Sequence, residues 1–497
     1  MGIRTGAQFT EGLRQRPRNV WLDGERIGDV SAHPAFAPAV AAIARIYDLQ
    51  HDPQYADILT YSLPASDARV GAAFMIPSSY EDIVKKRHAY RVVAESTFGM
   101  MGRSPDFLNT TLAAMSEARS VFARGGDAFA ENIVRYYQYV RDNDLFLTHA
   151  LITPQNDRSK TSSEQSDPYL HMGVVRETHD GLIIRGARML ATLGPIADEL
   201  LVYSLPGLKP GDEKHAVVFA LPIDAPGLRQ IAREPFERGH RSTFDHPFAT
   251  RFEECDTLVV FDDVLVPWDR VFIYGDVARA NSMYPDSNLR QYTAHQTAVR
   301  GLVKLETVAG IAMELAKTIK ADVHLHVQQM LGEIIDSIEL IKSCIVRSEI
   351  EYETNERGSI RPAFRPLQTA RTFMPRAYPR AVEILQTIGA GGLLMLPCGN
   401  DFASPIAADV QKYYQGAGVS ALERTKLFKL AWDLTGDAFG QRALQYERYY
   451  AGDPVRLTAQ AYLSYDKSTC ESLTARALAL TGEPGVAGAR RALTAAA

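Results

Sequence analysis

Three short stretches of the chain concentrate residue types that could do chemistry. The first, GMMGRSPDFLN at 99–109, places Arg103 where a helical pattern breaks around Gly102 and Pro105. An arginine at such a break can offer its planar fork of donors to an oxyanion or a phenolate. The alternative is an ion pair with Asp106 or another surface carboxylate. Both interpretations remain open from this stretch alone.

The second stretch, LTHALITPQNDRSK at 147–160, combines a histidine with a dense set of hydrogen-bond donors. His149 stands among apolar residues, and Gln155, Arg158, Ser159 and Lys160 follow it. The donors suit a polyanionic cofactor tail, and an imidazole titrates near neutral pH, as a general base requires. The alternative is a core histidine with satisfied hydrogen bonds beside a solvated loop.

The third stretch, GARMLATLGP at 186–195, carries Thr192 at the end of a predicted strand, where a hydroxyl is more often structural than functional.

The motifs G-x-G-x-x-G, G-x-x-x-x-G-K-[ST], H-E-x-x-H and G-x-S-x-G are absent. Gly389, Gly391 and Gly392 follow helical sequence rather than a strand, which argues against a nicotinamide site. No metal site is predicted, because the close pair His324 and His326 would point to different helix faces.

Composition excludes several classes of protein. With 497 residues, 46% hydrophobic, 23% charged and a formal net charge of -5, the chain is a folded protein without the basic excess of a nucleic-acid binder. Its four cysteines form no C-x-x-C pair, and its longest apolar runs fall short of the roughly 18 residues of a membrane span. The N-terminus lacks the apolar core of a signal peptide, so we expect a cytoplasmic protein without a membrane segment.

The hydrophobic periodicity changes twice along the chain. Spacings of three and four predict helices from Ser79 to Arg141, whereas short β-branched and aromatic runs separated by turns follow Asp144. The helical period returns after Trp268 and continues through Leu434. We therefore predict three packed domains: helical at 1–143, a β-domain of antiparallel strands at 144–272, and a helical bundle at 273–497 ending in a loose tail rich in Ala and Gly.

Five longer motifs occur in a characteristic order: MGRSPDF, LTHALITPQNDRSK, GARMLATLGP, FDDVLVPWDRV and YYAGDP. With them the chain resembles the two-component flavin-dependent phenol hydroxylases of the 4-hydroxyphenylacetate 3-monooxygenase large-subunit family. The resemblance implies an α+β fold similar to acyl-CoA dehydrogenases, with a helical N-terminal domain, a central antiparallel β-barrel and a C-terminal four-helix bundle. It also implies a homo-oligomer, expected to be a tetramer.

The resemblance further implies the reaction. Family members use diffusible reduced FAD (FADH2), which a separate NAD(P)H-dependent flavin reductase supplies, and O2 as co-substrate. A flavin C4a-hydroperoxide transfers its distal oxygen to the carbon ortho to a phenolic hydroxyl, which gives a catechol. The reductase and a small phenol are therefore the expected partners, and the missing nicotinamide motif is explained.

Site residues follow from the same resemblance. Arg103 and His149 would hold the phenolic hydroxyl, with His149 as base, and Ser204 and Leu205 would bind the far end of the substrate. Phe107 stands where 4-hydroxyphenylacetate hydroxylases commonly carry Tyr. His295 is a second candidate for the substrate site, or else a buried helix histidine. The expected flavin contacts are His149, Ala150, Leu151, Gln155, Asn156, Asp157, Arg158, Thr192, Gln386, Ala451, Gly452, Asp453 and Pro454.

Other functions compete with this one. The same chemistry could act on a coumarate, a tyrosine derivative, a carrier-tethered tyrosyl group or a halophenol. An acyl-CoA dehydrogenase-type flavoenzyme or a non-enzymatic flavin-binding protein are further alternatives. A 4-hydroxybutyryl-CoA dehydratase would need closely placed cysteines for an iron–sulfur cluster, but Met100 and Met101 occupy the first candidate region and Cys255 is the first cysteine of the chain.

Overall fold

The computed structural model describes residues 2–481 except 64–67, 238 and 240. The predicted loose tail lies outside these residues from 482 onward. Helices dominate the N-terminal region, as the periodicity predicts, and α4 begins with a capping box in which Ser79 accepts from Asp82 N. The helices of this region are α1 (Gly6–Gln15), α2 (Ala37–Leu49), α3 (Ala56–Leu59), α4 (Tyr80–Ser96), α5 (Pro105–Glu117), α6 (Arg119–Ala123) and α7 (Asp127–Asn143).

The middle of the chain forms two main sheets. The larger one has the strand order β2-β1-β10-β11-β7-β6, and the smaller one has the order β12-β9-β8-β5. The strands of the larger sheet are β1 (Val20–Leu22), β2 (Glu25–Ile27), β6 (Gly173–Glu177), β7 (Gly181–Thr192), β10 (Leu228–Ala232) and β11 (Asp256–Pro267). Those of the smaller sheet are β5 (Leu147–Ala150), β8 (Glu199–Val202), β9 (Val217–Pro222) and β12 (Val271–Tyr274).

The central antiparallel β-barrel that the resemblance implies is not seen among the described residues, whose main strands form two sheets. Two of the pairings are parallel: β1 with β10, and β5 with β8. The hairpin of β1 and β2 lies far from β10 in the sequence, so a local pattern could not reveal that it extends the larger sheet. An isolated bridge between Ile152 and Met189 links the end of β5 to β7.

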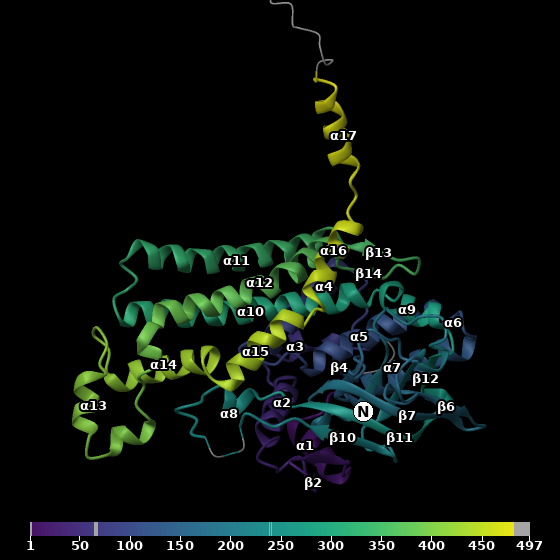
Figure 1. The fold of residues 1–497 in the computed structure, drawn as a ribbon, viewed down its shortest axis with the longest axis horizontal. Coiled ribbons are helices and arrows are strands. Elements are labelled where there is room, and N and C mark those ends of the chain that lie inside the picture. The colour runs from purple at the N-terminus through teal and green to yellow at the C-terminus, as the bar shows by residue number, and fades with distance from the viewer. Residues whose placement is uncertain (1, 64–67, 238, 240, 482–497) are drawn as a thin grey trace, which may run out of the picture.

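Long helices form the C-terminal region (Figure 1). Helices α10 (Leu289–Thr318), α11 (Leu325–Ile350) and α12 (Phe364–Gly389) pack side by side, and α4 from the N-terminal region packs against α10. The other elements are α8 (Ala249–Phe252), α9 (Val277–Asp286), α13 (Ala407–Tyr413), α14 (Ala421–Thr435), α15 (Ala438–Tyr449), α16 (Pro454–Leu463) and α17 (Ser468–Leu478), with small two-stranded sheets β3 (Thr60–Ser62) with β4 (Arg69–Gly71) and β13 (Glu353–Thr354) with β14 (Ile360–Arg361).

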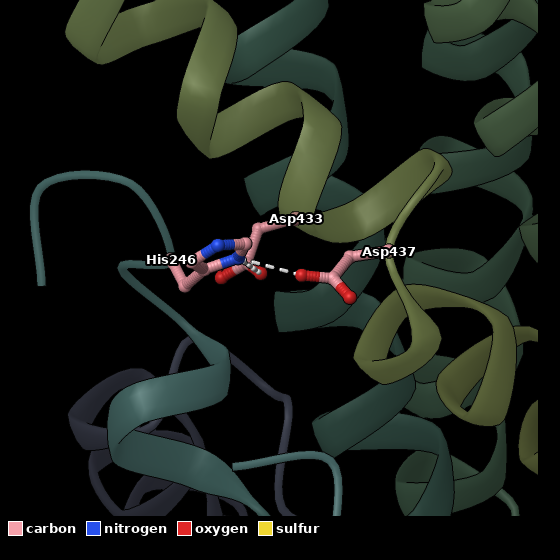
Figure 2. A group of neighbouring side chains, drawn as sticks. All are labelled: His246, Asp433 and Asp437. Atoms are coloured by element: carbon pink, nitrogen blue, oxygen red, sulfur yellow. Dashed lines mark hydrogen bonds and ion pairs between the residues drawn. The ribbon is translucent and has the colours of Figure 1, made fainter. Parts of the chain in front are cut away.

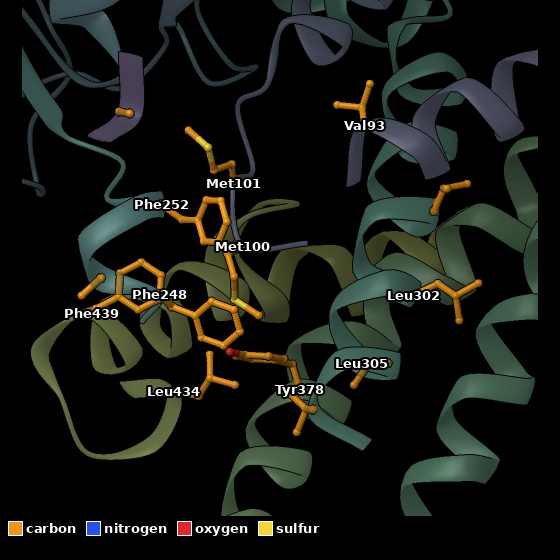
Figure 3. Close-up of a cluster of buried hydrophobic side chains, with 14 of the residues drawn as sticks. Val93, Met100, Met101, Phe248, Phe252, Leu302, Leu305, Tyr378, Leu434 and Phe439 are labelled. Atoms are coloured by element: carbon orange, nitrogen blue, oxygen red, sulfur yellow. The ribbon is translucent and has the colours of Figure 1, made fainter. Parts of the chain in front are cut away.

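One hydrophobic cluster joins these regions beside the first chemical motif (Figure 3). Met100 and Met101 are almost fully buried in it, together with the rings of Phe252 from α8 and of Phe248, the residue just before α8. The cluster also receives side chains from α4, α10, α12, α14 and α15. Because interiors are close-packed, these contacts fix the backbone immediately before Gly102. The domain boundaries at 143 and 272 stay predictions.

Candidate active site

Arg103 lies in the break between two helices that the sequence predicts. Helix α4 ends at Ser96, and α5 begins with Ser104 as its N-cap and Pro105 in its first turn. A Cβ at Gly102 would lie 2.7 Å from Tyr446 Cε1 and 2.8 Å from Tyr450 Cε2, so glycine permits this close approach. The Tyr450 hydroxyl donates to the Gly102 carbonyl at 2.6 Å. The break therefore holds Arg103 against α15.

The guanidinium of Arg103 packs against two aromatic rings. Its Cζ lies 4.2 Å from the ring centroids of both Phe107 and Tyr450. Its Nη1 is buried and has no hydrogen-bond partner among the described residues. Asp106, the alternative ion-pair partner, instead accepts from Ser104 Oγ and Gln296 Nε2. The guanidinium thus packs against two rings, while its Nη1 donor remains available.

His149 meets Arg103 inside the protein. Arg103 Nε donates to His149 Nε2 at 3.2 Å, and His149 Nδ1 lies 3.4 Å from the Tyr203 hydroxyl. An arginine can only donate, so Nε2 is the acceptor and Nδ1 carries the imidazole proton. Burial first, and then the charge of Arg103, lowers the pKa of His149 well below its ordinary value. The imidazole is therefore neutral at pH 7 and presents a basic nitrogen.

The charge of Arg103 is secure despite its burial. Burial lowers its pKa, but Tyr446, Tyr450 and Glu254 outweigh that effect, and the net shift is upward. Glu254 Oε1 also accepts from the backbone N–H groups of Gly102 and Arg103, at 2.7 and 2.9 Å. A permanent cation beside a neutral base is an arrangement that can accept a proton from a phenol and stabilise the resulting phenolate.

Phe107 lies one helical turn after Arg103 and closes the same site. Its ring meets the His149 ring edge-to-face at a centroid distance of 5.7 Å, and the Tyr450 ring at 6.0 Å. Unlike the tyrosine common in the resembled family, it offers no hydroxyl to a bound phenol. The structure thus brings Arg103, Phe107 and His149 together, as the sequence motifs predict.

An ion-pair network that sequence analysis missed connects Arg103 to Thr192. Arg442 on α15 binds Glu254 Oε2 at 2.8 Å and Asp256 Oδ1 at 2.8 Å. Asp256 Oδ1 in turn accepts from the Thr192 hydroxyl at 2.8 Å. In the sequence, each of these charged residues resembles a solvated surface residue. Only long-range packing brings them together into one ion-pair network. Arg442 therefore couples the backbone at Arg103 to the end of β7.

Thr192 fits a reduced flavin by its hydrogen-bonding capacity. Since its hydroxyl proton is donated to Asp256, its oxygen lone pairs can accept from a donor such as the N5–H of a reduced flavin. Thr148 Oγ1 donates to the Thr192 carbonyl at 2.8 Å and ties β5 to the end of β7. The residues around Thr192 are therefore held by bonds on both sides.

The remaining flavin candidates lie in two segments. Gln155, Asn156 and Arg158 are exposed and make no recorded side-chain bond or ion pair within the described part of the chain, which suits donors for a pyrophosphate. Asp157 is instead bound to Ser159. The second segment, 451–454, joins α15 to α16, where Arg371 binds the Ala451 carbonyl at 2.7 Å and Asp453 caps α16. The polar groups present fit a flavin nucleotide.

Ser204 and Leu205 follow β8 directly, next to Tyr203. Ser204 is 4% exposed, and its Oγ accepts from Nη2 of Arg188 at 2.8 Å. Arg188, which sequence analysis missed, lies on β7 and also donates to the Leu151 carbonyl at 2.9 Å. In a strand of alternating polar and apolar residues, an arginine resembles a solvent-facing residue. No feature of the sequence therefore identified Arg188 as a site residue. Ala150 and Leu151 continue from His149 toward this arginine.

Two further candidates have partners of their own outside this group. His295 on α10 is buried, its Nε2 lies 2.7 Å from Glu349 Oε1, and its ring meets Tyr90 edge-to-face. Gln386 on α12 is exposed and donates to the Thr435 carbonyl at 3.0 Å. Neither makes a recorded contact with Arg103 or His149 among the described residues, so their roles remain predictions.

A second polar cluster, shown in Figure 2, contains His246, Asp433 and Asp437. His246 Nδ1 lies 2.6 Å from Asp437 Oδ2, the same oxygen that Arg241 Nη1 contacts at 2.6 Å. Asp433 Oδ2 accepts from the backbone N–H groups of Phe248 and Ala249. The carboxylate spacing would suit a cation, but the guanidinium of Arg241 already supplies one. The cluster clamps the segment before α8 onto α14 and α15.

Comparisons with known proteins find matches over most of the chain. The models for the 4-hydroxyphenylacetate 3-hydroxylase N terminal and C terminal families match residues 5–273 and 280–479. The oxygenase component of 4-hydroxyphenylacetate 3-monooxygenase from Thermus thermophilus is 45% identical over 464 residues, covering 93% of this chain and 95% of that protein. A 4-nitrophenol 2-monooxygenase oxygenase component from a Rhodococcus species is 32% identical, covering 92% and 88%.

Solved structures give the same result. The oxygenase component of a 4-hydroxyphenylacetate 3-monooxygenase complexed with FAD and 4-hydroxyphenylacetate superposes with a TM-score of 0.92 at 44% identity, covering 96% of this chain and 98% of that one. An archaeal 4-hydroxybutyryl-CoA dehydratase shares the fold alone, with a TM-score of 0.86 at 22% identity. No helix in the described part of the chain is long and apolar enough to cross a membrane. The chain belongs to the 4-hydroxyphenylacetate 3-hydroxylase family.

Proposed function

We propose that this chain is the oxygenase component of a two-component, reduced-FAD-dependent monooxygenase that hydroxylates a phenol ortho to its hydroxyl group. The observation that carries the proposal is the buried contact between Arg103 Nε and His149 Nε2, beside an Arg103 donor that lacks a partner. This pair can receive a phenolic hydroxyl. The family membership supports the same reaction class.

The chain's own residues activate the phenol. His149 Nε2 accepts the phenolic proton, and Arg103 stabilises the phenolate oxygen with its charge and its free edge. The resulting negative charge enriches the ring carbon ortho to the oxygen. The rings of Phe107 and Tyr450 pack against the guanidinium and help to hold it in place. General base and oxyanion stabilisation thus act on one atom of the substrate.

Reduced FAD, when bound, supplies together with O2 the electrophilic oxygen atom. Thr192, held by Asp256, would accept a hydrogen bond from the flavin ring, and His149, Ala150 and Leu151 would be further contacts of the bound flavin. In the loop Gln155–Arg158, the side chains of Gln155, Asn156 and Arg158 would donate to the phosphates, and Asp157 would hold the loop through its bond to Ser159. The segment Ala451, Gly452, Asp453 and Pro454 supplies the C-terminal contact, and Gln386 reaches the flavin of a neighbouring subunit.

The name "oxygenase component" of the relatives supports a separate reductase as partner. We propose that this reductase uses NAD(P)H and releases FADH2, because the chain lacks a nicotinamide-binding motif. We also propose a homotetramer with an acyl-CoA dehydrogenase-like arrangement of the three domains. The identity of the phenol is a separate question, since relatives named for 4-hydroxyphenylacetate and for 4-nitrophenol both match. Phe107 and Leu205 each lack a side-chain hydroxyl at the substrate site.

The test mixes the purified chain with anaerobically reduced FAD and then with O2, in the presence of a panel of phenols. The panel contains 4-hydroxyphenylacetate, 4-coumarate, tyrosine derivatives, simple phenols and halophenols. We expect a catechol from at least one of them, together with a substrate-dependent change in the rate of flavin oxidation. Absence of catechol from every phenol, with flavin oxidation no different from that of free reduced FAD, would overturn the proposal.

A further inference from the structure

Tyr446 carries a buried hydroxyl group beside the candidate active site. It lies on α15, one helical turn after Arg442 and one turn before Tyr450. Its hydroxyl oxygen is buried and has no hydrogen-bond partner among the described residues. Burying a hydroxyl without a partner is unfavourable, and an unsatisfied group of this kind in a folded protein points to a bound ligand or water. The hydroxyl of Tyr446 therefore calls for a binding partner.

Close packing fixes the position of this hydroxyl. The guanidinium carbon of Arg442 lies 4.2 Å from the centroid of the Tyr446 ring, and the Tyr450 ring meets the Tyr446 ring edge-to-face at a centroid distance of 5.3 Å. A Cβ at Gly102 would lie 2.7 Å from Tyr446 Cε1 and 3.1 Å from its hydroxyl oxygen. The hydroxyl is thus held against the backbone that immediately precedes Arg103.

The charge of Arg103 acts directly on this hydroxyl. The Arg103 Cζ is 5.8 Å from the Tyr446 ring centroid. Burial raises the pKa of Tyr446, and the charge of Arg103 is the largest influence that opposes it. Of the other charged and titratable groups that face Tyr446, Glu254 and Tyr450 raise its pKa further and Arg442 lowers it. The net shift is upward, so the hydroxyl keeps its proton at neutral pH and can donate a hydrogen bond.

Arg103 contributes a second donor that lacks an acceptor. Its Nη1 is buried and has no partner within the described part of the chain. Glu254, the carboxylate that acts on both Arg103 and Tyr446, is already occupied. Its Oε1 accepts from the backbone N–H groups of Gly102 and Arg103, and its Oε2 accepts from Arg442. A single acceptor with several lone pairs would satisfy both unpartnered groups.

A phenolate oxygen is such an acceptor. In the proposed reaction His149 takes the phenolic proton, and the oxygen that remains has three lone pairs beside Arg103. Arg103 and the protonated imidazole of His149 can each donate to one of them. Phe107, whose ring contacts the same guanidinium, has no hydroxyl for the third. Tyr446 has one, and it approaches Arg103 from α15.

We infer that Tyr446 is a further catalytic residue, whose hydroxyl donates a hydrogen bond to the phenolate oxygen of the substrate at Arg103. The inference rests on the proposed function and deepens it, since it adds a third donor to the groups that stabilise the phenolate. Tyr446 keeps its own proton, and the proton of the substrate stays on His149. Because a hydrogen bond to a charged oxygen is stronger than one between neutral groups, the contribution of Tyr446 grows as the phenol ionises.

The first test replaces Tyr446 by Phe, which removes the hydroxyl and keeps the ring. We expect kcat/KM for catechol formation to fall roughly 10- to 100-fold, the range for a hydrogen bond to a charged group. Tyr378→Phe is the matched control and should keep the wild-type rate. Tyr378 on α12 also has a buried hydroxyl without a partner among the described residues, but it lies in the hydrophobic cluster of Figure 3. An unchanged rate in Tyr446→Phe, or equal losses in the two variants, would overturn the inference.

A double variant separates catalysis from packing. The ring of Phe107 contacts the same guanidinium, so Phe107→Tyr can supply a hydroxyl from α5 in place of the one that Tyr446→Phe removes from α15. We expect the double variant to recover several-fold in kcat/KM over Tyr446→Phe alone. No recovery would assign the Tyr446 hydroxyl to the packing of α15 and overturn the inference.

The ionisation of a bound phenol gives a readout that does not depend on turnover. The probe is 4-hydroxybenzaldehyde, whose phenolate has an absorption band of its own, bound together with reduced FAD under anaerobic conditions. A 10- to 100-fold loss of phenolate stabilisation corresponds to ionisation of the bound probe at a pH about one to two units higher in Tyr446→Phe than in the wild type. Tyr378→Phe should show the wild-type value.

This readout also separates the inference from the proposed function. The expected change in probe ionisation supports the role of Tyr446 even where no phenol yields a catechol, and in that case the proposed function alone fails. Equal ionisation of the probe in the wild type and in Tyr446→Phe would overturn the inference. Weaker binding of reduced FAD as the only change would place the Tyr446 hydroxyl at the flavin and overturn it as well.

Discussion

Arg103 donates from Nε to Nε2 of His149 across 3.2 Å, so the cation and the base of the site are bonded to each other. A phenolic hydroxyl that binds between them would replace the Arg103–His149 hydrogen bond with two new ones, one to each residue. The base must then be neutral beforehand, and the lowered pKa of His149 provides that state over a wide pH range. The contact also explains why the two residues, although 46 positions apart, act as one unit.

Replacing Arg103 by Met should lower kcat/KM for hydroxylation by roughly 10²- to 10³-fold, the usual cost of removing an oxyanion donor. Catechol formation at a fixed supply of reduced FAD is the measurement. The double variant with His149→Gln should be little worse than the more affected single variant, because both residues act on the same substrate atom. Fully multiplicative losses would show that the two side chains act independently.

The pKa of His149 predicts how stability depends on pH. In the unfolded chain the imidazole takes up a proton near its ordinary pKa of 6.5, whereas in the folded chain it does so only at a lower pH. The unfolded state thus binds more protons below pH 6.5, so the free energy of unfolding falls as the pH drops. His149→Gln removes this contribution.

We therefore expect the difference in unfolding midpoint between about pH 8 and about pH 5.5 to be smaller in His149→Gln than in the wild type. Calorimetric scans at the two pH values measure it. His88→Gln, at an exposed position of α4, is the control and should keep the wild-type difference. Identical pH dependence in wild type and His149→Gln would contradict the burial of a neutral imidazole.

Glu447 holds two buried cations. It binds Arg300 with both oxygens, at 2.5 and 3.0 Å, and Lys304 at 3.0 Å, and these cations keep its pKa at about 2 although burial alone would raise it. Glu447→Gln should lower the free energy of unfolding by about 3–5 kcal/mol, because it leaves two buried charges without compensation. Chemical denaturation measures this change. Glu314→Gln, whose partner Lys317 is exposed, should leave it nearly unchanged.

Thr192→Val removes a hydroxyl with little change of shape. The variant loses the bond to Asp256 and the acceptor proposed for the flavin ring, so reduced FAD should bind more weakly and a larger share of the O2 consumed should appear as hydrogen peroxide instead of catechol. Equilibrium binding of reduced FAD and the ratio of peroxide to catechol are the measurements. Thr257→Val is the control, since Thr257 bonds the Ala191 carbonyl and Gln230 in the same sheet. Equal effects in both variants would show general disturbance of the sheet.

The helical regions and the break at Arg103 could be predicted from sequence, because Gly102, Ser104 and Pro105 act through local backbone chemistry. The open sheets could not, since the parallel pairing of β1 with β10 joins segments about 200 residues apart. In the site, the motifs identified Arg103 and His149. Arg188 and Arg442 could not be identified from sequence. The role of an arginine depends on which hydrogen-bond and ion-pair partners it has or lacks in the folded protein.

Phe107→Tyr tests how the site holds the phenol. The ring of Phe107 covers the guanidinium of Arg103 and meets His149 with its edge, so a hydroxyl on this ring enters the region where the phenolic oxygen binds. One added neutral hydrogen bond should lower KM by roughly 2- to 10-fold, with little change in kcat. Steady-state kinetics with several phenols measure this change, and the effect should be similar across the panel because it concerns the common hydroxyl end. A change confined to phenols with one kind of para substituent would instead place Phe107 at the far end of the substrate, opposite to the orientation that Arg103 and His149 imply.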